Sequence, residues 1–468
     1  MLSAVFALAL ALALASLLPH AGTAAPRTPA AARLRLPAGA TQLGIENVEG
    51  VVLMPAILRG LAGRDTAGLL VVDTGAGFLG LDAALAKRLG LIEPGDDRTG
   101  ISLSPTPLPR LELGSAQLDA IAPILLLDAK VIRRATGRNV LGLAGQGVFA
   151  GRAVWIDYAS QRLVFVASPP GNGAGSPHHA DSLETMAADS FRVAERAAGR
   201  SARATRSRAL LAPLLSSAAQ AIPFRLAGDH KILIRGRFRE NATAEPGPWM
   251  DLVFDTGATK SVLFESPLRE AYPAAQHWRS VGGLVAPTLT GNATARIALA
   301  PLFELASTQP LAPLQRSRVD CAVINSNLAE QLSSATEATI VGLVGYSFFK
   351  DYRLAVDYPN RMLWLDPNPK HRGAALDAHP FEYSHAGLQL ERDGESIRVL
   401  GLATDSPAEH AGIAVGDTLV AVGKTAVRAN DLSRASALLE GRPGTIVRIT
   451  LRRDGVERSY RLVRKQLL

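Results

Sequence analysis

Two long stretches of the chain consist of short apolar runs separated by turn residues. Apolar runs of this length, bounded by Gly, Pro, Asp and Asn, are typical of buried β-strands. The clearest runs are VVLMPAIL, LLVVD, AVWIDY and RLVFV in residues 33–168, and KILIRGRF, DLVFD, YRLAVDY and MLWLD in residues 222–367. The pattern predicts a mostly β fold in both stretches.

The segment between them, residues 169–221, lacks this pattern. It opens with a run rich in Gly, Ser and Pro and continues with one rich in Ala, Arg and Ser. This composition, without clean strand signals, predicts a flexible linker, with a helix over part of it as the alternative. Its length and basic character also suggest a segment that is cleaved on activation. A short connector then leads to a final module at 381–468.

The N-terminus is an apolar run that ends at Pro19 and is followed by small residues. This is the pattern of a secretory signal peptide over residues 1–25. No Lys or Arg precedes the run, so an uncleaved anchor is the alternative, and it would be the only contact with a membrane. No Cys follows the run, which excludes a lipoprotein. We therefore expect an exported protein, periplasmic or secreted, of a bacterium.

Composition narrows the function classes. A chain of 468 residues is too long for one core, and about three domains are expected. Many basic residues lie in 192–208 and at the C-terminal end, and aromatic residues make up only 5%, so we expect no nucleic-acid partner. The lone Cys321 rules out an intrachain disulfide, and its apolar neighbours indicate a buried strand. The His residues are scattered, so we expect neither a metal nor a cofactor.

An internal repeat relates the two β stretches. LLVVDTGAGFLGLD around Asp73 matches MDLVFDTGATKSVLF around Asp255. Further on, residues 139–166 match residues 339–366 without a gap. Two motifs that occur twice in the same order predict two copies of one β-domain.

Each copy carries an Asp-Thr-Gly-Ala turn directly after an apolar strand. The turns are Asp73, Thr74, Gly75 and Ala76 in the first copy, and Asp255, Thr256, Gly257 and Ala258 in the second. The Gly permits a tight turn and close approach of a substrate, and the Thr hydroxyl can hold the turn by hydrogen bonds. One such tetrapeptide would be an ordinary β-turn. Two copies, each followed downstream by an apolar-apolar-Gly segment, indicate a paired site.

These motifs resemble those of the retropepsin-like aspartyl proteases, the bacterial relatives of the retroviral protease subunit. The segments NVLG and TIVG, which contain Gly142 and Gly342, stand where that family has a ψ-shaped loop. The resemblance implies two barrel-like β halves that form a pseudo-twofold dimer. It also implies that Asp73 and Asp255 are the catalytic residues.

Two carboxyl groups that meet in one cleft cannot both ionise easily, so they would share one proton. The ionised member would activate a water as general base, and the protonated member would act on the scissile carbonyl. Ala76 and Ala258 supply no hydroxyl to favour the charged form, so we expect a mildly acidic to near-neutral optimum. Gly77 stands where the family has Ser or Thr, as Thr259 does in the second copy. This departure is either harmless or marks a weakened half-site.

The final module resembles a bacterial PDZ domain. SPAEHAGIAVGD fits the family's pattern, and HAGLQL (385–390) takes the place of the carboxylate-binding loop. By this resemblance Ala386, Gly387 and Leu388 would contact a peptide C-terminus that adds as an extra strand. A PDZ domain that only packs on the protease body is the alternative.

Three alternatives for the two halves remain open. The first is an endopeptidase acting on proteins or peptides, with one dyad per chain, and the two intact Asp-Thr-Gly triplets favour it. The second is a catalytically inactive scaffold of the cell envelope that acts through the PDZ domain. The third pairs each half with the same half of another molecule. Flaps over the cleft are expected at 98–108 and 280–292.

Overall fold

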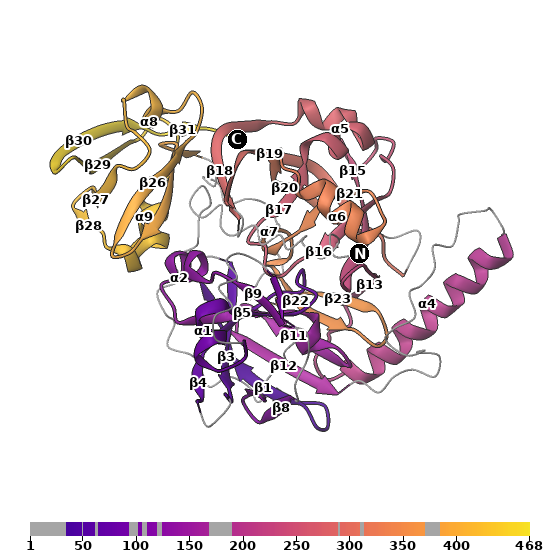
Figure 1. Ribbon diagram of the computed structural model, residues 1–468. Coiled ribbons are helices and arrows are strands. Elements are labelled where there is room, and N and C mark those ends of the chain that lie inside the picture. The colour runs from indigo at the N-terminus through magenta and orange to yellow at the C-terminus, as the bar shows by residue number, and fades with distance from the viewer. Residues whose placement is uncertain are drawn as a thin grey trace.

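The computed structural model contains two β-rich halves and a separate C-terminal module (Figure 1). It describes residues 34–48, 50–60, 64–92, 102–104, 110–118, 124–167, 190–288, 291–308, 313–369 and 384–468. The predicted signal peptide, most of the expected first flap and residues 169–189 of the expected linker lie outside these ranges.

The first half is a sheet whose central strands are buried because apolar side chains cover both faces. Strand β10 lies between β4 and β5, parallel to the first and antiparallel to the second. The strands are β1 (Thr41–Gly44), β2 (Glu46–Val48), β3 (Val51–Leu58), β4 (Thr66–Val72), β5 (Leu79–Asp82), β6 (Ser102–Ser104), β7 (Leu111–Leu113), β8 (Ala116–Leu118), β9 (Ile124–Leu127), β10 (Val140–Ala144), β11 (Arg152–Asp157) and β12 (Arg162–Ala167). The helices are α1 (Ala83–Arg88), α2 (Lys130–Thr136) and α3 (Gln146–Phe149).

The second half repeats this arrangement. Strand β21 lies between β16 and β17, again parallel to the first and antiparallel to the second. The strands are β13 (Gln220–Pro223), β14 (Arg225–Ala227), β15 (Lys231–Arg239), β16 (Met250–Phe254), β17 (Ser261–Phe264), β18 (Ser280–Thr288), β19 (Gly291–Leu305), β20 (Leu314–Ile324), β21 (Ile340–Val344), β22 (Tyr352–Asp357) and β23 (Met362–Pro367). The helices are α5 (Glu265–Ala271), the 3-10 helix η2 (Pro273–His277), α6 (Leu328–Thr336) and α7 (Tyr346–Phe349).

One six-stranded sheet joins the two halves, in the order β1-β12-β11-β22-β23-β13. Its central strands, β11 and β22, are antiparallel, and Trp155 faces Ala355. These two residues occupy the same position in the two copies of the repeat. A strand position that pairs with its own counterpart lies on a twofold axis, so the pseudo-twofold axis passes through this pair.

Helix α4 (Ser190–Leu211) shows that the prediction of a flexible linker over 169–221 is wrong from Ser190 onward. The helix extends from the body, and its last turn packs Leu211 into a cluster on the six-stranded sheet (Figure 1). Ala and Arg are both strong helix formers, so the composition allows the helix, and the apolar contact at Leu211 anchors it.

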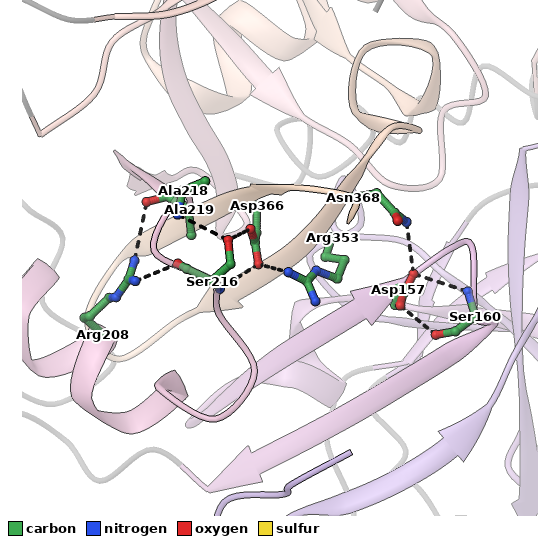
Figure 2. Close-up of polar contacts among 9 residues, drawn as sticks. All are labelled: Asp157, Ser160, Arg208, Ser216, Ala218, Ala219, Arg353, Asp366 and Asn368. Atoms are coloured by element: carbon green, nitrogen blue, oxygen red, sulfur yellow. Dashed lines mark hydrogen bonds and ion pairs between the residues drawn. The ribbon is translucent and has the colours of Figure 1, made fainter. Parts of the chain in front are cut away.

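Polar contacts fix the chain after α4 to the same sheet (Figure 2). Arg208 donates to the carbonyl of Ser216 at 2.6 Å. The Ser216 N–H and hydroxyl both donate to the Asp366 carboxylate, at 2.9 and 2.5 Å. Arg353 pairs with this carboxylate at 2.5 Å. The Asp366 charge is therefore fully compensated although the residue is buried.

The C-terminal module has a sheet in the order β25-β26-β27-β29-β30 and its own apolar core. Its strands are β24 (Ser384–His385), β25 (Leu388–Asp393), β26 (Ser396–Leu402), β27 (Thr418–Val422), β28 (Thr425–Ala426), β29 (Ile446–Arg453), β30 (Val456–Val463) and β31 (Lys465–Gln466). Its helices are α8 (Pro407–His410), the 3-10 helix η4 (Ala429–Asp431) and α9 (Leu432–Leu439).

The module contacts the hairpin β18–β19 of the second half (Figure 1). The Gln389 side chain accepts from Val285 N–H at 2.9 Å and donates to Val285 C=O at 2.7 Å, as a neighbouring strand would. Thr404 N–H donates to Gly282 C=O at 3.0 Å. The C-terminal Leu468 is buried in the same apolar cluster as the hairpin. Hydrogen bonds and apolar contacts thus attach the module to the hairpin that contains the expected second flap.

The predicted fold class is confirmed: the protein is mostly β, with two barrel-like halves related by a pseudo-twofold axis and an α+β C-terminal module. Cys321 lies in β20 and is fully buried, as its apolar neighbours predicted. None of the helices in the described part of the chain is long and apolar enough to span a membrane.

Candidate active site

Asp73 and Asp255 follow equivalent buried strands, β4 and β16, at the point where the chain leaves the sheet. The last backbone bond of each ladder is made by the Asp itself. Asp73 N–H donates to Ala144 C=O, and Asp255 N–H donates to Val344 C=O, both at 3.0 Å. The bonds to the parallel neighbours β10 and β21 thereby fix the point along each strand at which the Asp residue leaves the sheet.

The two glycines predicted for the ψ-shaped loop lie in these neighbouring strands. A Cβ on Gly142 would overlap the carbonyl oxygen of Gly80, and a Cβ on Gly342 would overlap that of Val262. Only glycine permits this close approach of the strands behind the Asp. The role of both residues is therefore to pack the sheet that carries the turns.

The two turns are joined by reciprocal hydrogen bonds across the pseudo-twofold axis. Thr74 N–H donates to Thr256 Oγ1, and Thr256 N–H donates to Thr74 Oγ1, both at 3.0 Å. Each hydroxyl then donates to a carbonyl of the opposite strand, Thr74 to Phe254 at 3.1 Å and Thr256 to Val72 at 2.7 Å. All these groups are buried, so the four bonds hold the two Asp residues at a fixed separation.

Backbone N–H groups orient the carboxyl groups. Gly75 and Ala76 donate to Asp73 Oδ1 at 2.9 and 3.0 Å, and Gly257 donates to Asp255 Oδ1 at 2.8 Å. A Cβ on Gly75 would lie 2.5 Å from the carboxyl carbon of Asp255. The first turn therefore passes directly beside the carboxyl group of the second half, and both Asp residues come from one chain.

The two carboxyl groups titrate as a pair. Burial raises the pKa of Asp73 well above its usual value, and the charge of Asp255 raises it further. Burial also raises the pKa of Asp255, against the opposing effects of its hydrogen bonds with Asp73 and Gly257. Asp255 Oδ2 is buried, and the described residues supply no hydrogen-bond donor to it. A hydrogen bond links the carboxyl groups of Asp73 and Asp255. A proton held between the two carboxyl groups satisfies this geometry.

A hairpin turn of each half packs on the active-site turn of the other half. A Cβ on Gly77 would overlap the backbone oxygen of Asp229, in the turn between β14 and β15. Across the axis, a Cβ on Gly50 would come within 3.3 Å of Thr259. Gly77 and Thr259 are equivalent positions, and in each contact a glycine faces a larger residue. Gly77 thus has a steric reason for its departure from the Ser or Thr pattern.

Sequence reasoning missed a buried cation beside the dyad. Lys231, the first residue of β15, is 1% exposed. Its Nζ donates to Gly75 C=O at 3.1 Å and to Asp229 Oδ2 at 2.9 Å. Its charge lowers the pKa of both Asp73 and Asp255, against the larger effect of burial. The sequence contains one indication of this residue: a Lys stands at the start of an apolar strand, at the position where the first copy has Val51.

The expected second flap, 280–292, forms β18 and the beginning of β19, whose turn at 289–290 lies outside the described residues. Val281 and Leu284 of this hairpin share an apolar cluster with Ala258 of the second active-site turn. The hairpin that contacts the C-terminal module therefore belongs to the same apolar cluster as the second active-site turn. Within the described ranges, no three His, Cys, Asp or Glu side chains are grouped as ligands for a metal ion.

The three residues expected to bind a peptide C-terminus lie between β24 and β25. Ala386 and Leu388 are buried in the core of the module, and Gly387 has a positive φ of 91°. The Gly387 N–H already donates to His385 Nδ1 at 2.9 Å. A bound carboxylate would have to replace this bond, so peptide binding at this loop stays a prediction.

Comparison with known proteins gives limited likeness across the chain. No curated protein matches it. Similar solved structures include an aspartic proteinase from Irpex lacteus, 11% identical, with 72% of this chain and 99% of that one covered and a TM-score of 0.39. The basic 7S globulin from soybean is 12% identical, with 73% and 99% covered and a TM-score of 0.38. Likenesses at these TM-scores add no weight to the geometry.

One further solved structure and one family model complete the comparison. A photosystem II D1 C-terminal processing protease is 32% identical over 21% of this chain, with a TM-score of 0.18, and this chain spans only 25% of that protein's length. A model of the PDZ domain family matches residues 398–453. The chain therefore carries a PDZ domain at its C-terminal end.

Proposed function

We propose that this protein is an exported aspartic endopeptidase in which Asp73 and Asp255 form one dyad within a single chain. The main support is the reciprocal bonding of the two Asp-Thr-Gly turns. Thr74 and Thr256 tie the turns together so that two buried carboxyl groups share one proton. Perturbed carboxyl pairs of this kind are common at catalytic sites.

The chemistry follows from the shared proton. The ionised carboxylate takes a proton from a water molecule as the water oxygen attacks the scissile carbonyl carbon. The protonated carboxyl group donates its proton to the carbonyl oxygen, giving a neutral tetrahedral diol. Collapse of the diol breaks the C–N bond while the amine nitrogen receives a proton and one hydroxyl proton returns to the dyad. No covalent intermediate with the protein is needed.

Substrate access requires a conformational change. Asp73 is 2% exposed and Asp255 is 1% exposed, so neither carboxyl group is open to an extended peptide in this state. The hairpin β18–β19 shares an apolar cluster with the second active-site turn and is hydrogen-bonded to Gln389 of the PDZ domain. Opening of this hairpin would admit protein or peptide substrates, as loop closure does in many enzymes.

The PDZ domain would recruit substrates or partners through their C-termini. Export to the periplasm or the medium rests on the N-terminal sequence pattern. An N-terminal sequence determined on protein from the culture medium and from the periplasm would test cleavage after residue 25. An intact N-terminus on membrane-bound protein would favour the uncleaved anchor instead.

Cleavage of unfolded casein and of a quenched peptide library, measured from pH 3 to pH 8, tests the proposal. Asp73→Asn and Asp255→Asn should each abolish cleavage, because one dyad needs both carboxyl groups. A pepstatin-type inhibitor should block the wild type. Asp357→Asn is the matched control, since Asp357 is equally buried but caps a turn through Asn360.

The possible outcomes separate the alternatives. Loss of activity in both Asp variants but not in the control supports a shared dyad. Residual activity in one variant points to halves that act separately. No cleavage by the wild type at any pH would leave the PDZ domain as the functional site of a scaffold protein.

A further inference from the structure

The buried Lys231 is an asymmetric feature of an otherwise repeated site. Leu53 pairs with Val71, and Leu233 pairs with Val253, each two residues before an active-site Asp. Val51 and Lys231 are therefore equivalent positions, and both are 1% exposed. One half places an apolar side chain beside the turns, and the other places an ammonium group there.

The ammonium group is held at a defined place by the opposite half. Its Nζ bonds to the carbonyl of Gly75, the residue whose Cα adjoins the Asp255 carboxyl group. Asp229, in the turn between β14 and β15, supplies the counter-charge at 2.9 Å. This approach is possible because Gly77 has no side chain to collide with Asp229.

We infer that Lys231 is a positioning residue of the dyad: its fixed positive charge keeps one carboxyl group ionised as general base in a fully buried site. This inference rests on the proposed function. Without a cation, burial would favour protonation of both carboxyl groups, and the general base would be lost. The titratable groups that act on the dyad besides Lys231 are Asp229, through its pairing with Lys231, and Tyr358, whose pKa is raised by its burial and by the Asp73 charge.

The substitution Lys231→Met tests this role. Removal of the positive charge should move both limbs of the pH profile of kcat/KM to higher pH, by about one unit. Asp229→Asn should move them in the opposite direction, because it removes the negative charge and leaves the ammonium group. Lys260→Met is the matched control, since Lys260 is also buried but is paired with Asp320. It should leave the position of both limbs unchanged.

Two results would overturn the inference. In the first, Lys231→Met lowers kcat without moving the limbs, as a purely structural residue would. In the second, Asp229→Asn and Lys231→Met move the profile in the same direction. If the Met variant folds poorly, Asp229→Asn alone still tests the inference, because an unchanged pH profile in that variant would overturn it.

A second measurement separates this inference from the proposed function. Chemical denaturation across pH reports the dyad's titration even in an inactive protein. The change in pH dependence caused by Lys231→Met should be smaller in an Asp73→Asn, Asp255→Asn background, because only the part that acts through Asp229 remains there. A wild type that cleaves nothing but shows this coupling would refute the protease and retain the Lys231 role. Equal pH dependence in both backgrounds would refute the role of Lys231.

Discussion

The reciprocal threonine bonds allow a quantitative prediction for Thr74→Val. Valine has the same shape as threonine but no hydroxyl group, so the change removes two of the four hydrogen bonds that the two threonines make between the turns. The Thr256 N–H loses its acceptor, and the Phe254 carbonyl loses a donor. Both groups are buried, and water does not replace the missing partner.

The magnitude follows from the number of groups left unpaired. A buried polar group that loses its partner costs about 1–3 kcal/mol, so two such groups should lower the free energy of unfolding by about 2–6 kcal/mol. Thr74→Ser keeps the hydroxyl and loses one methyl group, which costs about 1 kcal/mol. The quantity to measure is thus the difference in the free energy of unfolding between Thr74→Val and Thr74→Ser.

Tryptophan fluorescence during chemical denaturation is a suitable assay. All four Trp residues, at positions 155, 249, 278 and 364, lie in the two β-rich halves and none in the PDZ domain. The signal therefore reports the unit that the threonine bonds hold together. Thr336→Val is the matched control, because the buried Thr336 hydroxyl donates to Leu332 C=O within helix α6.

The control should cost less than about 1 kcal/mol, since the Leu332 carbonyl keeps its helical partner. If Thr74→Val proved no more destabilising than Thr74→Ser or the control, the bonds across the axis would not stabilise the pairing of the halves. The two turns would then be held together by the six-stranded sheet alone.

Three further predictions concern charge and domain contacts. Burial raises the pKa of Asp73 above its value in the unfolded chain, so the folded state is more stable at acid pH and loses this stability as pH rises. Asp73→Asn should therefore raise the thermal midpoint more at pH 8 than at pH 4. Equal effects at both pH values would contradict this. Gln389→Ala removes both bonds to Val285, so hydrogen exchange measured by mass spectrometry should accelerate in β18; unchanged exchange would mean that the PDZ domain does not hold the hairpin. Burial and the Arg464 charge lower the pKa of His385 to about 4, so the PDZ domain should lose stability as pH falls toward 4; an NMR titration midpoint near the ordinary value of about 6.5 would refute this.

The sequence was sufficient for the repeated parts of the fold. The Asp-Thr-Gly-Ala turn occurs twice and the segments at 139–166 and 339–366 align without a gap, so the pairing of Asp73 with Asp255 was predicted from the repeat. The apolar runs predicted the central strands because these are buried on both faces and tolerate no other pattern. The PDZ domain was predicted from a local motif that sets its own turn and helix.

Contacts between segments far apart in the sequence could not be predicted from local patterns. The helix α4 was only the alternative to a flexible linker, because its stability depends on packing of Leu211 against a sheet from both halves. The attachment of the PDZ domain includes two hydrogen bonds from one amide side chain, Gln389, which takes the place of a neighbouring strand. Nothing in a polar residue's local pattern indicates such a partner. Lys231 was missed for the same reason, since its meaning depends on the opposite half.

Duplication within one chain explains why the site can be asymmetric. In a homodimer of identical halves, each position occurs twice, so a cation at the Lys231 position would face its own copy across the axis. Here the equivalent position is Val51, and a single buried cation acts on a pair that shares a single proton. The position that departs from the family pattern, Gly77, is the one that admits the Asp229 turn and its lysine. The absence of Ser or Thr at position 77 is therefore a steric requirement of the turn that holds the cation beside both carboxyl groups.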